Sequence, residues 1–214
     1  MSPRLPDGWW PNFGPTPNAE SSGLTGVCHD IVGTDGLAFS PGVQKEDKLW
    51  LFNDQLCRSI WLTHEEDVNI DGIKALKFTP PKEVFSFANP DNFCYCPDIQ
   101  ECAEEVDSET WDLTNCERCV DGIISLEGCQ GVPVIMSTPH FLDGDERLWE
   151  AIDGLQPVKD LHVTYLNLEP LSGKKYSGLC SASAVSNERK YFRDAHAGTQ
   201  AYSDQLAGVS IRLF

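Results

Sequence analysis

The chain has 214 residues, of which 41% are hydrophobic and 23% are charged, and its formal net charge is −17. These proportions match an ordinary soluble domain and exclude a disordered or fibrous chain. The 33 acidic residues outnumber the 16 basic ones. This balance argues against a nucleic-acid partner, because phosphate contacts need clustered Lys and Arg. The sequence has no run of about 18 apolar residues, the length that a membrane-spanning helix needs.

Composition divides the chain into three parts. Residues 1–23 hold five prolines and show no hydrophobic period, which is typical of a loop or a disordered segment. Residues 24–173 alternate turn signals with short apolar runs. Residues 174–214 carry six basic residues against three acidic ones, so the sign of the charge changes there. We therefore expect a folded body over 24–173 and a divergent basic tail that is not part of its fold.

Short strands are expected along the whole body. The alternation of apolar and polar residues between turn signals predicts strands over residues 48–52, 58–64, 73–79, 132–137 and 163–168. Tight turns are expected at residues 34–36 and 69–72, because Asp-Gly suits positive φ angles. An acidic first turn before apolar residues at helical spacing predicts a short helix over 145–152. Many short strands with few helices indicate a β-rich α+β domain.

Nine cysteines are the most unusual part of the composition, and they are compatible with metal binding or with disulfides. A zinc site in a cytosolic interaction module would use Cys94, Cys96, Cys116 and Cys119. Only one C-x-x-C pair is present, whereas structural zinc sites usually have two. Irregular spacing among loops favours disulfides, although the N-terminus has no apolar signal-peptide core. One cysteine of nine must stay unpaired, and Cys180 in the basic tail is the natural candidate.

Patterns of catalytic residues are missing from the sequence. The five histidines are scattered, and we find no nucleophile elbow, zinc-protease motif, phosphate-binding loop or dinucleotide fingerprint. His140, between Pro139 and Phe141, is more often a hydrogen-bonded structural residue than a general base. The acidic stretch over 98–121 lacks the residue order of a calcium loop and indicates a solvated loop. The sequence predicts no enzyme and no cofactor.

Six segments, taken in order, resemble the class B scavenger receptors. They cover residues 28–36, 57–60, 89–96, 139–142, 152–157 and 168–173. The resemblance implies the middle of an ectodomain, with an incomplete antiparallel barrel-like core, short helices, disulfide-linked loops and an internal tunnel for lipid. It also implies a non-enzymatic receptor for lipids, fatty acids, lipoproteins or a protein ligand. Such a receptor lies at the plasma membrane or the lysosome, with the ectodomain on the extracellular or lumenal face.

The resemblance also implies residue roles. The expected disulfides are Cys28–Cys94, Cys57–Cys129 and Cys96–Cys119, with Cys102–Cys116 as a further pair that closes the acidic insertion. The family signature residues are expected to be structural, and they are Gly33, Thr34, Asp35, Gly36, Pro139, His140 and Phe141. Family ectodomains are rich in Asn-x-Ser/Thr glycosylation sites, whereas this sequence has none. Because the resemblance covers only part of an ectodomain, we expect a truncated piece, with a genuine short isoform as the alternative. In isolation it is expected to show weak or no saturable binding of fatty acids.

Overall fold

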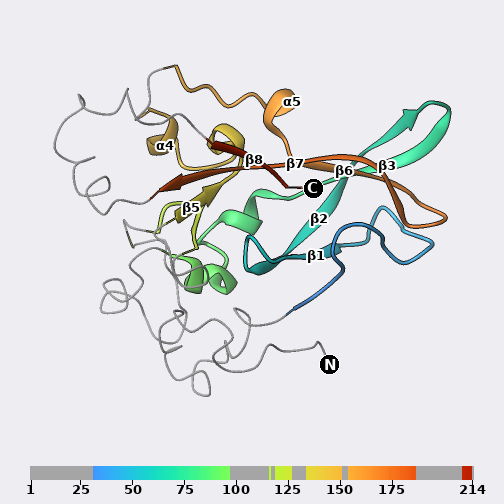
Figure 1. Cartoon of the computed structure of the whole chain (residues 1–214), viewed down its shortest axis with the longest axis horizontal. Helices are drawn as coiled ribbons and strands as arrows, with labels where there is room; N and C mark the ends of the chain where they lie inside the picture. Colours follow the sequence, from blue (N-terminus) through green and yellow to red (C-terminus); the bar gives the residue numbers. More distant parts are fainter. Residues whose placement is uncertain are drawn as a thin grey trace.

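The computed structural model describes residues 31–96, 116, 119–126, 134–150, 154–186 and 209–213. These residues form an eight-stranded antiparallel sheet that curls into a half-barrel (Figure 1). The strands are β1 (Leu49–Asn53), β2 (Arg58–Ile70), β3 (Ile73–Thr79), β4 (Ile123–Ser125), β5 (Val134–Ser137), β6 (Tyr165–Glu169), β7 (Lys174–Ser186) and β8 (Val209–Leu213). The helices are short and comprise η2 (Lys82–Phe85), η3 (Pro90–Tyr95), η4 (Pro139–Phe141), α4 (Glu146–Glu150) and α5 (Lys159–His162). The expected β-rich α+β class is confirmed.

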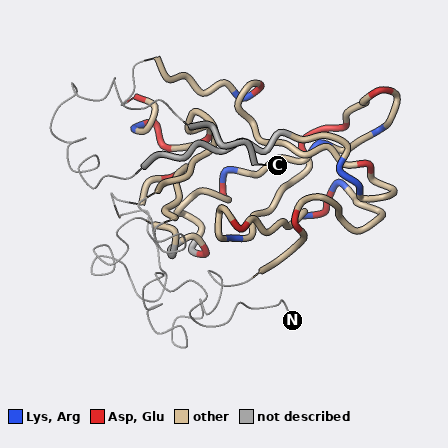
Figure 2. Tube along the Cα trace, in the orientation of Figure 1, with Lys and Arg blue, Asp and Glu red and all other residues tan. Residues whose placement is uncertain are grey.

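The first three strands form a meander whose turns follow from the sequence. Asp71 and Gly72 both have positive φ angles, 52° and 86°, and they join β2 to β3 directly after the pair Ile70 and Ile73. Two residues with positive φ match the twist of the flanking strands. Pro80 and the proline after it end β3, because proline has no backbone N–H to donate to a ladder. Acidic and basic residues are interspersed over the described part of the chain (Figure 2).

The strand order is β1-β2-β3-β6-β7-β5-β4, and β8 also pairs with β7. The first half of β7 pairs with β6, and its second half pairs with β5 and β8. The boundary expected after Gly173 therefore falls in the turn between β6 and β7, and the sheet continues through Ser186. Residues 1–23 lie outside the described part of the chain.

The core has two main clusters, and β2 contributes to both. In the first half of β2, Arg58, Ile60 and Leu62 are buried and the residues between them are not, because successive side chains of a strand point to opposite faces. Ile60 belongs to the cluster that β2 shares with β4 and β5, and Leu62 to the cluster that it shares with β3 and β6. Phe78 and Leu168 are fully buried in the second cluster. Burying such side chains contributes about 1.5–3 kcal/mol each.

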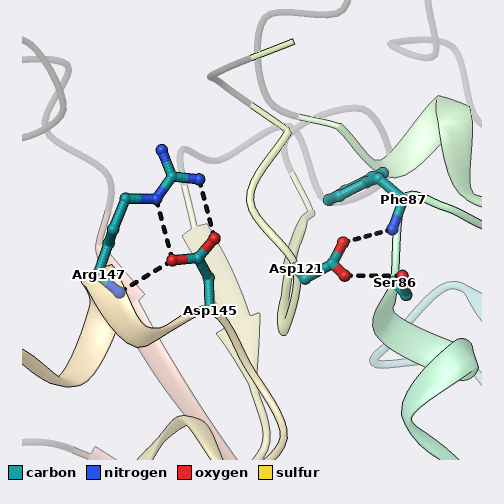
Figure 3. A network of polar contacts seen from close by, with 5 residues as sticks. All are labelled: Ser86, Phe87, Asp121, Asp145 and Arg147. Atoms are coloured by element: carbon teal, nitrogen blue, oxygen red, sulfur yellow. Dashed lines mark hydrogen bonds and ion pairs between the residues drawn. The ribbon is translucent and has the colours of Figure 1, made fainter. Parts of the chain in front are cut away.

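A carboxylate ties the segment after η2 to the start of β4 (Figure 3). The hydroxyl of Ser86 donates to Oδ2 of Asp121 at 2.7 Å, and the backbone N–H of Phe87 donates to Oδ1 at 2.7 Å. The backbone N–H of Gly122 donates to the carbonyl of Phe85 at 2.8 Å. These bonds join residues about 35 positions apart and hold β4 against η2. We call Ser86, Phe87 and Asp121 the β4 clamp.

Candidate ligand-binding site

An apolar pocket lies in the curve of the sheet, where β1, β2, β5, β6 and β7 contribute side chains. Its volume is about 70 Å³. The walls are mostly aliphatic or aromatic, and these lining residues are Leu51, Leu56, Ile60, Leu62, Pro80, Phe85, Met136, Tyr165 and Leu166. Most of them also belong to the two core clusters or pack against these clusters. The pocket is therefore a gap in the core of the half-barrel.

Polar groups line part of the same pocket. Lys175 is the one basic residue among its described lining residues, and Asp35 is the one acidic residue. The remaining polar lining residues are Asn53, Ser137, Thr138 and Thr164. Lys175 lies on β7 and is half-buried, whereas its neighbour Lys174 is exposed and does not line the pocket. An apolar wall with one ammonium group has the chemistry that an amphipathic anion needs.

The segment Gly33–Gly36 brings Asp35 to this pocket through backbone pairing. The N–H of Thr34 donates to the carbonyl of Trp50 at 3.1 Å, and the carbonyl of Thr34 accepts the N–H of Phe52 at 2.8 Å. Gly33 has a φ of 94°, and a Cβ atom there would lie 2.0 Å from the Trp50 carbonyl oxygen. Glycine is the residue that allows this approach. The signature segment therefore makes structural contacts with β1.

The segment Pro139-His140-Phe141 forms η4, in which His140 and Phe141 both have a φ of 55°. The hydroxyl of Thr138 donates to the carbonyl of Leu142 at 2.6 Å and closes the turn. The ring of His140 stacks on the ring of His162. The ring centroids are 3.8 Å apart, and the angle between the ring planes is 5°. In the described part of the chain, this signature histidine lies against a second imidazole and does not line the pocket.

The four cysteines whose side chains the structure describes are all disulfide-bonded. Cys96 and Cys119 form a disulfide with a Cα–Cα distance of 5.0 Å, as the resemblance implied. Cys57 and Cys116 are also disulfide-bonded. Their expected partners, Cys129 and Cys102, lie outside the described residues, as do Cys28 and the side chains of Cys94 and Cys180. The pairs Cys28–Cys94, Cys57–Cys129 and Cys102–Cys116 therefore stay predictions.

The zinc alternative disagrees with this bonding. The sulfurs of Cys96, Cys116 and Cys119 lie within 4.8 Å of one another, as they would around a metal. A zinc ligand must be a free thiolate, however, and these three sulfurs are held in disulfides. The zinc-site alternative is therefore wrong for Cys96, Cys116 and Cys119. The side chain of Cys94, the fourth ligand in that alternative, lies outside the described residues.

A buried arginine, whose role sequence reasoning missed, joins two of the signature segments. The Nη2 group of Arg58 donates to Oδ1 of Asn92 at 2.7 Å, and its guanidinium lies 4.2 Å from the ring centroid of Tyr95. The amide of Asn92 in turn donates to the carbonyls of Val84 and Ser86. Burial lowers the pKa of Arg58 and raises the pKa of Tyr95. Because these contacts satisfy backbone groups in the core, they are structural.

In the described part of the chain, every helix is too short or too polar to cross a bilayer. The model of the CD36 family matches residues 13–178 of the chain. The chain is 31% identical over 150 residues to lysosome membrane protein 2 of Mus musculus, covering 70% of this chain and 28% of that protein. It is 30% identical over 163 residues to sensory neuron membrane protein 2 of Drosophila melanogaster, covering 75% of this chain and 28% of that protein.

The chain thus spans less than a third of the length of these relatives. The family match covers most of the chain and includes every signature segment named above. The Gly33–Gly36 contacts, the η4 turn and the Cys96–Cys119 disulfide lie inside the matched residues. The chain belongs to the CD36 family, the class B scavenger receptors.

Proposed function

We propose that the whole protein is a non-enzymatic membrane receptor whose ectodomain binds amphipathic lipids, such as fatty acids or the lipids of lipoproteins. In this proposal, the pocket in the curve of the sheet forms part of the lipid-binding surface. The observation that carries the proposal is the pocket itself, which combines an apolar wall with one lysine. An acyl chain suits the wall, and a carboxylate or phosphate suits the ammonium group.

The size of the pocket indicates that this chain supplies only part of the site. Pockets for drug-sized ligands measure about 300–1,000 Å³, and an engineered cavity that takes up benzene measures about 150 Å³. The pocket here, at about 70 Å³, is smaller than both. A whole acyl chain therefore needs space from outside the described residues. We expect weak binding by the isolated chain and tight binding by a longer protein that contains it.

The proposal is tested with a photoreactive diazirine analogue of palmitic acid added to the 214-residue chain. We expect crosslinks at the pocket walls, on peptides that carry Met136 or Leu166, and we expect excess oleate to displace them. Lys175→Gln should lower the labelling about fivefold, which corresponds to an ionic hydrogen bond of about 1 kcal/mol at a half-buried site. Lys174→Gln is the matched control, because Lys174 does not line the pocket.

Equal labelling in the two lysine variants would contradict the role of Lys175. Labelling spread evenly over the surface, without displacement by oleate, would contradict lipid binding by this pocket. A titration with oleate measures the strength of binding separately. Submicromolar stoichiometric binding would show that the pocket expands to hold a lipid without further segments.

A further inference from the structure

The stacked histidines join two segments that are otherwise separate in the sequence. His140 belongs to η4, and His162 is the last residue of α5. The Nδ1 atom of His162 accepts the backbone N–H of Val158 at 2.9 Å, so this ring also caps the first turn of its own helix. An acceptor nitrogen must be unprotonated, which fixes His162 as a neutral ring in this arrangement. The η4 turn holds His140 in place with a positive φ, which is uncommon for residues other than glycine.

We propose that the His140–His162 stack is a pH-sensitive clasp, which holds α5 on the η4 turn at neutral pH and releases it in an acidic compartment. Protonation of His162 would place a new N–H against the N–H of Val158 and remove that hydrogen bond. This change acts at the ring that stacks on His140, and it opposes the closed arrangement.

The charged groups around the clasp give little compensation for a cation at His162. Lys159 and Asp160 lie on α5 itself, and Asp143 follows η4. Glu65 on β2 is paired with Lys159 at 2.7 Å and with Lys77 of β3 at 3.1 Å. The Glu65 carboxylate, which contacts α5 through Lys159, is thus already bonded to two lysines.

The direction of the titration agrees with the geometry. Partial burial, and to a smaller extent the neighbouring His140, lower the pKa of His162 below its usual value of 6.5. A histidine with a lowered pKa stabilises the closed state fully above about pH 6.5. That contribution is lost as the pH falls through the pKa of the folded state. Hydrogen bonding from Lys159 lowers the pKa of Glu65, so the Lys159–Glu65 pair persists in this pH range and the release affects the end of α5.

Hydrogen exchange of the α5 amides tests the clasp. The N–H groups of Leu161 and His162 donate to the carbonyl of Val158, and the N–H of Val163 donates to the carbonyl of Lys159. We expect exchange at these amides, corrected for its intrinsic pH dependence, to rise about fivefold between pH 7.2 and pH 5.0. That factor corresponds to one hydrogen bond of about 1 kcal/mol. His162→Gln should abolish the rise, because a Gln carbonyl accepts a hydrogen bond at either pH.

His64→Gln is the matched control, since His64 lies on β2 and pairs with Asp67 outside the clasp. It should leave the pH response unchanged. NMR titration of the unaltered chain gives a second readout that does not depend on a variant. We expect a His162 pKa below 6.5, and His140→Phe should raise it by keeping the stacked ring without its charge. A His162 pKa of 6.5 or more, or an unchanged response in His162→Gln, would overturn the proposal.

Discussion

Replacing Asp121 with alanine removes the acceptor of the β4 clamp and tests how strongly η2 and β4 are joined. Hydrogen bonds to a charged acceptor contribute about 1.5–3 kcal/mol each, and a half-buried site calls for the lower figure. The two bonds at 2.7 Å therefore predict a loss of about 3 kcal/mol in the free energy of unfolding. With a urea m-value of about 2 kcal/mol/M, the unfolding midpoint should fall by about 1.5 M. Asp121→Asn keeps one good acceptor and should lose about 1 kcal/mol.

Asp145→Ala is the matched control for this experiment (Figure 3). The Asp145 carboxylate binds the side chain and the N–H of Arg147, two residues along the chain, and among the described residues its hydrogen bonds reach no distant segment. Exposed local ion pairs of this kind contribute below about 1 kcal/mol. If Asp121→Ala loses no more free energy of unfolding than Asp145→Ala, the reasoning is refuted. That reasoning holds that the β4 clamp stabilises the fold because it is partly buried and joins residues far apart in the sequence.

Three further outcomes follow from the described contacts. Replacing both Cys96 and Cys119 with serine should cost about 3 kcal/mol in urea unfolding, because their 23-residue separation closes a loop in the unfolded chain; an unchanged midpoint would contradict this. Glu65→Gln should make the free energy of unfolding fall less steeply below about pH 4.5. The lowered pKa of Glu65 stabilises the fold above that pH, and this stabilisation is lost as the pH drops through the pKa of Glu65 in the folded state. An equal dependence of stability on acidic pH in both proteins would contradict this. Alkylation of the denatured, unreduced chain should modify about one thiol, because the four expected disulfides would use eight of the nine cysteines. Three or more modified thiols would contradict at least one of the expected pairs.

Strands with clear alternation and strong turn residues were predictable from the sequence. The strand expected over 73–79 agrees with β3, and the one over 58–64 agrees with the first half of β2. The second half of β2 was missed, because residues 65–67 are all acidic and hide the alternation. In the structure, Glu65 and Glu66 pair with Lys77 on the neighbouring strand, which makes their place in a sheet favourable.

The strand β7 and the pocket could not be predicted in the same way. Residues 174–186 are rich in Ser and Ala and lack large apolar residues at every second position. Pairing with three other strands determines their extended conformation, so tertiary contacts override a weak local preference. The His140–His162 stack likewise depends on contacts between segments 22 positions apart, for which the sequence shows no period.

The strand order has a consequence for the sequence of events during synthesis. β1, β2 and β3 are neighbours in the chain and in the sheet, so they can pair as soon as they leave the ribosome. Among the described strands, β7 alone bridges β6 to the β5–β4 hairpin, and it is made after both. The ladder of the half-barrel therefore closes late, and until then β5 and β6 each present an unpaired edge to other chains. In pulse-labelled refolding, amides of β2 and β3 should gain protection before those of β5, and simultaneous protection would argue against this order.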